Sequence, residues 1–204
     1  MKVGILVECG RQGLESVVCG RLCELLSEHT GVEFEFDIMP MDNKKNLILE
    51  CGTATKNLFA SGCDRVVILW DERPAWPKKD DKLCWHNDRQ DILANLRENG
   101  VELQNVHLVC IEREFESWLL FDERMLSGVL STDSHKVKIR RQKNPDRMPN
   151  PKGTMTSLFQ RNGGKRYVDI QFARDFARNL DDLARLKRCT TFQRFGLKVT
   201  GRTI

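Results

Sequence analysis

The apolar residues of this chain form short continuous runs that alternate with longer stretches of helical spacing. Residues 2–8, 64–70 and 106–110 are apolar at nearly every position, which is typical of strands covered on both faces. Residues 32–38 instead alternate apolar and acidic side chains, which predicts a more exposed strand near a sheet edge. The pattern therefore predicts four strands separated by longer segments.

The longer segments carry the spacing of amphipathic helices. Residues 14–28, 47–61 and 88–99 place apolar side chains at helical intervals, and a glycine follows closely after each stretch. Strands that alternate with helices of this length predict an α/β fold, a mainly parallel sheet flanked by helices. In such sheets, functional sites form at the carboxyl ends of the strands.

The second half of the chain has a different pattern. Residues 112–130 follow the last strand with helix-forming residues and predict one buried helix, whereas 131–153 are polar, basic and proline-containing. Helical spacing returns in three stretches, 152–160, 169–178 and 179–189, and Asp181 and Asp182 would start the last of these, where the helix dipole favours acids. We therefore expect an α/β domain over 1–130, and a basic loop with a helical C-terminal extension over 131–204, packed on it.

Composition narrows the class of protein. Hydrophobic residues make up 40% of the 204 positions and charged residues 30%, as in a soluble globular protein. No apolar run is long enough to span a bilayer, and the N-terminal run ends too soon for a signal peptide. Because the eight cysteines accompany no export signal, they are expected to be reduced thiols. We expect a cytoplasmic protein that does not bind membranes.

Charge is distributed unevenly along the chain. Residues 1–134 contain 15 Lys and Arg against 24 Asp and Glu, whereas residues 135–194 contain 16 against 5. The basic part suggests a polyanionic partner such as nucleic acid, although the two halves could simply attract one another. The basic segment 136–147 fits phosphate-backbone contact, unless it is only a solvated loop. Its candidate residues are Lys136, Lys138, Arg140 and Arg141.

Three glutamates stand at the start of the predicted helix 112–130. On a helical wheel, apolar side chains surround Glu114 and Glu116, so at least one glutamate should be drawn into the interior. A buried carboxylate is costly unless it is paired or bound to a metal. Either an arginine such as Arg113 or Arg124 pairs with it, or it belongs to a metal or acid–base site.

Acidic residues also end the predicted strands. Glu8 ends the first strand, Asp71 ends the third, and Glu114 and Glu116 lie just beyond the fourth. Since parallel strands bring their carboxyl ends to one edge, these side chains could converge on a site for Mg²⁺ or Mn²⁺. A remaining carboxylate would then act as an acid or base. The alternative is that acidic residues merely end strands and solvate the loops.

The arrangement resembles the topoisomerase–primase (TOPRIM) fold, in which an apolar strand ends in Glu and a later one is followed by Asp-x-Asp. The block Glu114-x-Glu116-x-Trp118-Leu119-Leu120-x-Asp122 is similar to the hallmark of a bacterial TOPRIM-like family of unknown function, related to OLD-type nuclease domains. Asn150-Pro151-Lys152 and Cys189-Thr190-Thr191-Phe192 fit the same family, so the resemblance covers nearly the whole chain.

The resemblance implies a metal-dependent nuclease with a Mg²⁺ or Mn²⁺ cofactor, acting beside an ATPase partner in bacterial anti-phage defence. Glu8, Asp71 and Glu116 would carry catalysis, and these three with Glu114 would hold the metal. Arg73 stands where the family pattern has the second Asp of Asp-x-Asp. A cation there could repel Mg²⁺ or hold a phosphate of nucleic acid. The alternative function is therefore a non-catalytic subunit that binds nucleic acid or a partner ATPase.

Overall fold

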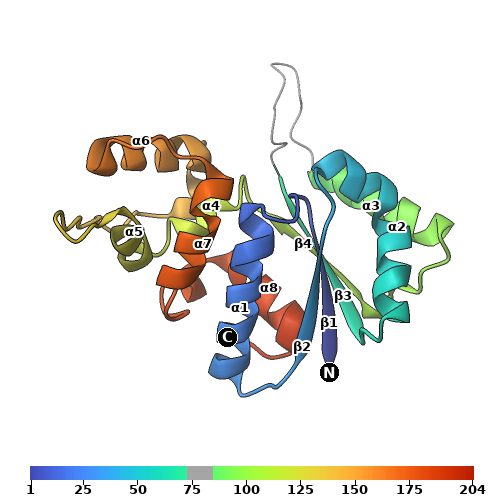
Figure 1. Cartoon of the computed structure of the whole chain (residues 1–204). Coiled ribbons are helices and arrows are strands. Elements are labelled where there is room, and N and C mark those ends of the chain that lie inside the picture. Colours follow the sequence, from blue (N-terminus) through green and yellow to red (C-terminus); the bar gives the residue numbers. More distant parts are fainter. Residues whose placement is uncertain (73–84) are drawn as a thin grey trace.

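The computed structural model describes residues 1–72 and 85–204. Within them, a parallel sheet is built from β1 (Lys2–Val7), β2 (Glu35–Pro40), β3 (Arg65–Asp71) and β4 (Val106–Ile111), in the order β2-β1-β3-β4 (Figure 1). The predicted α/β class and parallel strands are confirmed. The alternating strand lies at a sheet edge, as its pattern indicated.

The two central strands, β1 and β3, are buried at every position after their first residue. Their continuous apolar runs are explained by helices that cover both faces of the sheet. The register pairs Val7 with Leu69 and Asp71 with Ile111, so β1, β3 and β4 end at the same edge. This edge lies at the top of the sheet in Figure 1.

Helices α2 (Lys44–Ala60) and α3 (Trp85–Glu98) cover one face of the sheet (Figure 1). Leu47, Leu58 and Leu96 belong to the apolar core on this side. The two helices approach closely at Gly52, where an added Cβ would lie 2.7 Å from the backbone oxygen of Asn95. A glycine is thus required for this contact.

Helices α1 (Leu14–Thr30), α7 (Asp169–Asn179) and α8 (Thr190–Thr200) lie on the opposite side (Figure 1). Val18 of α1, Phe176 of α7 and Phe192 of α8 are fully buried in one core with the sheet. The helical C-terminal region therefore packs against the same face as α1. The division into an α/β domain over 1–130 and an extension over 131–204 stays a prediction.

The prediction of a single helix over 112–130 is wrong. The chain turns at Arg113, whose φ of 72° lies in the left-handed region, and forms the short helix α4 (Glu116–Leu119). It then starts α5 (Glu123–Leu130) at Asp122, whose carboxylate accepts hydrogen bonds from the backbone amides of Arg124 and Met125. A side-chain cap of this kind competes with helix continuation.

The prediction of a helix over 179–189 is also wrong. Only a 3₁₀ turn, η3 (Leu186–Arg188), forms there, and the last helix begins at Thr190. Asp182 does not start a helix but accepts a hydrogen bond from the amide of Ala184 and pairs with Arg124. Leu180, Leu183 and Leu186 are buried, and their packing takes precedence over local propensity.

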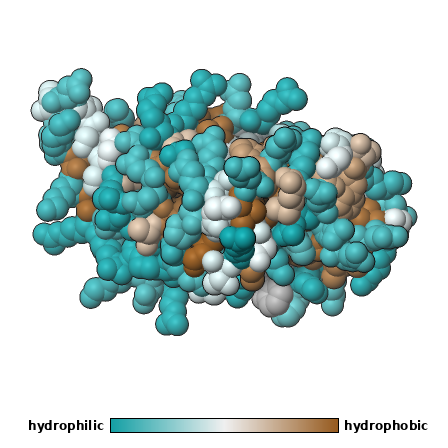
Figure 2. Space-filling model, turned by 90° about the horizontal axis from the view of Figure 1, so that it is seen from below, coloured by the Kyte–Doolittle hydropathy of each residue, from teal (hydrophilic) through white to brown (hydrophobic). Residues whose placement is uncertain are grey.

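The remaining elements are η1 (Leu103–Asn105), η2 (Pro145–Arg147) and α6 (Pro151–Gly163), with the segment before α6 irregular as expected. Figure 2 shows one face on which hydrophilic side chains predominate and apolar areas are small. Of the described helices, none combines the length and apolar character that crossing a bilayer requires. The described cysteines are free thiols, as predicted.

Candidate active site

A pocket of about 430 Å³ opens at the edge where the central strands end. It is lined by all four acidic residues that the sequence singled out for metal binding: Glu8, Asp71, Glu114 and Glu116. Parallel strands thus bring together carboxylates that are more than one hundred positions apart in the sequence. Their roles as ligands or catalysts stay predictions.

Glu8 and Asp71 form the floor of this pocket from adjacent strands. Each is only 8% exposed, and Glu8 Oε2 and Asp71 Oδ1 have no hydrogen-bond partner among the described residues. Burial raises the pKa of Glu8 to about 8. Burial also raises the pKa of Asp71, and the charge of Glu8 raises it further. The pair is poorly stabilised as two free carboxylates.

Glu114 and Glu116 reach the pocket from the turn that Arg113 makes between β4 and α4. Glu114 Oε2 accepts a hydrogen bond of 2.9 Å from the backbone amide of Lys152, in the first turn of α6. Its position therefore depends on a helix that follows in the chain nearly forty residues later. The left-handed backbone at Arg113 costs energy for a non-glycine residue, and such strain is often stored at functional sites.

Glu116 is the buried glutamate that the sequence pattern predicted, with 4% exposure. Neither suggested arginine pairs with it, because Arg113 contacts Glu72 and Arg124 contacts Asp182. Instead the Tyr167 hydroxyl donates a hydrogen bond of 3.1 Å to Glu116 Oε1. Burial raises the pKa of Glu116 to about 7, so this group can exchange a proton near neutral pH.

Lys152 brings a positive charge to the pocket. Its Nζ lies 2.7 Å from Asp169 Oδ2 and 3.8 Å from Glu116 Oε1. Burial lowers the pKa of Lys152, but the neighbouring charges of Glu116 and Asp169 raise it by more, so the ammonium stays protonated. This cation offsets part of the negative charge beside Glu116.

Three residues that the sequence alone did not single out also line the pocket: Glu15, Lys152 and Asp169. Tyr167, which contacts Glu116, was not singled out either. Glu15 lies in the first turn of α1, and burial raises its pKa. The loop before α1 is tight, since a Cβ at Gly13 would lie 2.6 Å from the Cys9 side chain. The position of Glu15, Lys152 and Asp169 in the first turn of a helix was the sequence signal that could have identified them.

Within residues 1–72 and 85–204, no three His, Cys, Asp or Glu side chains stand ready as a metal-ligand set. A preformed cage of protein ligands, as structural Zn²⁺ needs, is therefore excluded for these residues. Mg²⁺ makes a smaller demand, since one or two carboxylates with water and substrate phosphate suffice. The partnerless, buried oxygens of Glu8 and Asp71 fit that requirement.

The predicted nucleic-acid residues lie away from this pocket. Lys136, Lys138, Arg140 and Arg141 are exposed in the irregular segment before α6, and none of them is among the described lining residues. Arg73, the fifth residue of that prediction, lies outside the described residues. Phosphate contact by these side chains stays a prediction.

No family model, curated protein or solved structure matches the chain. The four-stranded parallel sheet with flanking helices is consistent with a TOPRIM fold without identifying one.

Proposed function

We propose that this protein is a TOPRIM-like phosphodiesterase that uses Mg²⁺ or Mn²⁺ to cleave nucleic acid. One observation carries the proposal: two buried carboxylates, Glu8 and Asp71, end adjacent parallel strands and each leaves an oxygen without a partner. Burying such groups without compensation is costly. Glu8 and Asp71 would hold a divalent cation, whose charge would offset those of the two carboxylates.

The surrounding residues suit phosphoryl chemistry. Glu8 and Asp71 would hold a divalent cation, which when bound would supply Lewis-acid polarisation of a phosphoryl oxygen. Glu116, with a pKa near 7, can accept a proton from the attacking water or hand one to the leaving oxygen. The Lys152 ammonium is placed to attract phosphate charge, since it shares the pocket with these carboxylates. Tyr167 holds Glu116 in position.

The test is cleavage of labelled DNA and RNA by purified protein with Mg²⁺ or Mn²⁺, alongside Glu8→Gln, Asp71→Asn and Glu116→Gln. We expect each of these variants to lose at least about 100-fold in rate, as when a charged catalytic group is removed. The matched control is Glu102→Gln, which removes an exposed glutamate before β4, outside the carboxylate pocket. Cleavage that survives in the pocket variants would refute the proposal.

A second candidate function is a non-catalytic subunit that binds nucleic acid or a partner ATPase. It is favoured by the ammonium of Lys152, which already compensates Glu116, and by the missing three-ligand set in the described part of the chain. It predicts that calorimetry detects no Mn²⁺ binding at millimolar concentration. Mn²⁺ binding that disappears in Asp71→Asn would instead favour the enzyme. The family resemblance suggests an ATPase partner in anti-phage defence, which co-purification from cells that carry both proteins would test.

A further inference from the structure

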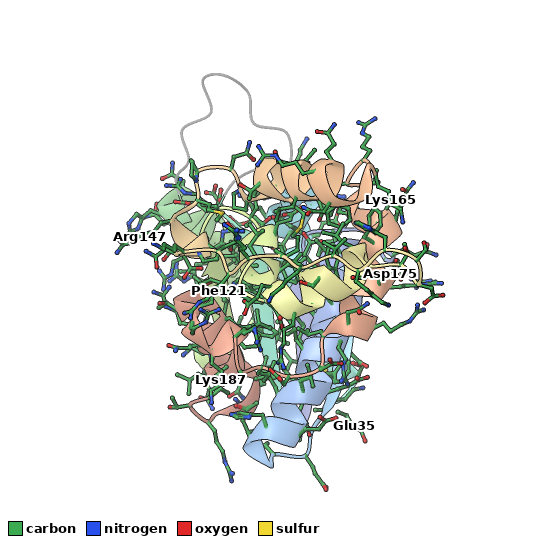
Figure 3. All side chains as sticks on the ribbon, turned by 90° about the vertical axis from the view of Figure 1, so that its left-hand side faces the viewer. Glu35, Phe121, Arg147, Lys165, Asp175 and Lys187 are labelled. Carbon is green, nitrogen blue, oxygen red and sulfur yellow. The ribbon has the colours of Figure 1, made fainter. Side chains whose placement is uncertain are left out.

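A second hollow of about 690 Å³ lies on the side of the molecule formed by residues 141–147 and the start of α8. Four basic side chains line it, and a single acidic one, Asp146, accompanies them. We call the four residues the basic groove: Arg141, Lys143, Arg147 and Arg188. Figure 3 shows Arg147, Phe121 and Lys187 on this side.

The acidic residue of the hollow does not neutralise the groove. Asp146 Oδ1 accepts a hydrogen bond of 3.1 Å from the Cys189 thiol, and burial raises the pKa of Asp146. Arg141, Lys143 and Arg147 make no ion pair with any residue of the described ranges, and all three are exposed. Their charges are therefore available to an anion from outside.

Arg188 is fixed in place rather than mobile on the surface. Its guanidinium donates a hydrogen bond of 2.9 Å to the backbone oxygen of Phe121 and lies over the Phe121 ring, 5.6 Å from the centroid. Burial lowers the pKa of Arg188, and the nearby charge of Arg141 lowers it further. Its charge is partly offset by Glu123, whose Oε2 lies 3.9 Å away, so Arg188 mainly supplies a fixed donor beside the free cations of the groove.

The groove leads toward the carboxylate pocket. Asp146 and Arg147 also line a neighbouring hollow of about 560 Å³, which contains Arg194, Arg113 and Glu72. Glu72 and Arg113 directly follow Asp71 and directly precede Glu114, and both of these neighbours line the carboxylate pocket. A phosphate chain lying along both hollows would thus reach residues that adjoin the carboxylates in the sequence.

We propose that the basic groove binds the phosphate backbone of a nucleic-acid strand and guides it toward the carboxylate pocket. The guiding step rests on the proposed function, whereas binding in the groove does not. A polymer is favoured over a free nucleotide because basic residues continue through Arg147 into the second hollow. Of the five residues predicted to contact phosphate, this assigns only Arg141 to the groove. It adds Lys143 and Arg147 from the predicted basic segment, and Arg188 from outside it.

The chain supplies a matched pair of variants for the test. Arg141→Ala/Lys143→Ala removes two charges from the groove, and Lys165→Ala/Arg166→Ala removes two exposed charges from the loop after α6, outside the groove. Binding of a fluorescent 20-nucleotide DNA strand is measured by anisotropy in EDTA across a salt series. EDTA removes any divalent cation, so neither metal binding nor cleavage affects this measurement.

We expect the groove variant to bind about tenfold more weakly and to flatten the slope of log affinity against log salt by about 1.4, since each single-strand phosphate contact contributes about 0.7. The control variant should stay within about twofold of wild type. Equal losses in both variants, or no loss in the groove variant, would overturn the proposal. So would displacement of the strand by micromolar mononucleotide, which would identify a nucleotide site instead.

Two further measurements separate this proposal from the proposed function. Asp71→Asn should bind the strand as wild type does, because it removes no charge from the groove. The groove variant should keep any Mn²⁺ affinity detected by calorimetry. Strand binding that depends on the groove, without Mn²⁺ binding, would overturn the proposed nuclease function and support the groove proposal. Mn²⁺-dependent cleavage with unchanged strand binding in the groove variant would support the nuclease function and overturn the groove proposal.

Discussion

Glu8→Gln should stabilise the metal-free protein at alkaline pH. In the fold, burial raises the pKa of Glu8 from 4.5 to about 8. Between these values the folded protein binds a proton that the unfolded chain releases, so the free energy of unfolding falls as pH rises. The stabilising contribution is present in full below pH 4.5 and is lost above pH 8. Glutamine is neutral throughout and avoids this loss.

The size of the effect follows from the shift in pKa. Each pKa unit corresponds to about 1.4 kcal/mol, so the rise of Glu8 amounts to about 5 kcal/mol at pH 8.5. Because the charge of Glu8 also raises the pKa of Asp71, removing that charge makes Asp71 easier to ionise as well. The variant should therefore match wild type near pH 4.5 and exceed its free energy of unfolding by about 3–5 kcal/mol at pH 8.5.

The assay is urea unfolding in EDTA at pH 4.5, 6.5 and 8.5, repeated with Mn²⁺. Wild type should lose stability as pH rises and regain it with Mn²⁺, because a bound cation favours the ionised carboxylates. Glu8→Gln should lose less stability than wild type as pH rises, and should regain less with Mn²⁺. Glu112→Gln, at an exposed glutamate, is the control and should follow wild type. A variant that tracks wild type at all three pH values would refute the assigned burial penalty.

Three other substitutions probe the pocket and its supports. Tyr167→Phe removes the hydrogen bond to Glu116 and should cost about 1–2 kcal/mol at pH 8.5, measured by urea unfolding; an unchanged value would show that the bond contributes nothing. Lys152→Met should raise the pKa of Glu116, because the lysine charge lowers it. In a plot of cleavage rate against pH, the transition near neutral pH should therefore move to higher pH. A transition at the same pH as in wild type would contradict this electrostatic role. Arg113→Gly relieves a left-handed backbone at the cost of a 3.5 Å contact with Glu72, so thermal unfolding should show a net gain of up to about 1 kcal/mol; a marked loss would show that the arginine side chain matters more than its backbone.

The sequence block around Trp118 combines residues that line the pocket with residues that hold the backbone in place. Glu114 and Glu116 face the pocket, whereas Trp118 is fully buried and donates a hydrogen bond of 2.8 Å from Nε1 to Thr191 Oγ1. Asp122 then caps α5. The block therefore alternates residues that reach the site with residues that fix the backbone carrying them.

Local periodicity misled where tertiary contacts set the backbone. Helix-forming residues continue from 112 to 130, but the turn at Arg113 and the cap at Asp122 divide the segment. The apolar side chains thought to surround one helix are instead buried in successive short elements. A buried Glu116 was still predicted correctly, because a carboxylate among many apolar neighbours is drawn inward in either conformation.

The sequence by itself determined the strands, their parallel arrangement and the acidic residues at their ends. These features depend on burial and periodicity within a few residues, which local composition records. Only the tertiary structure decided which other groups join Glu8 and Asp71. Lys152 and Tyr167 come from distant segments whose helices dock beside the sheet edge, and no local pattern specifies such long-range contacts. The same reason places Arg188 beside Arg141 in the basic groove.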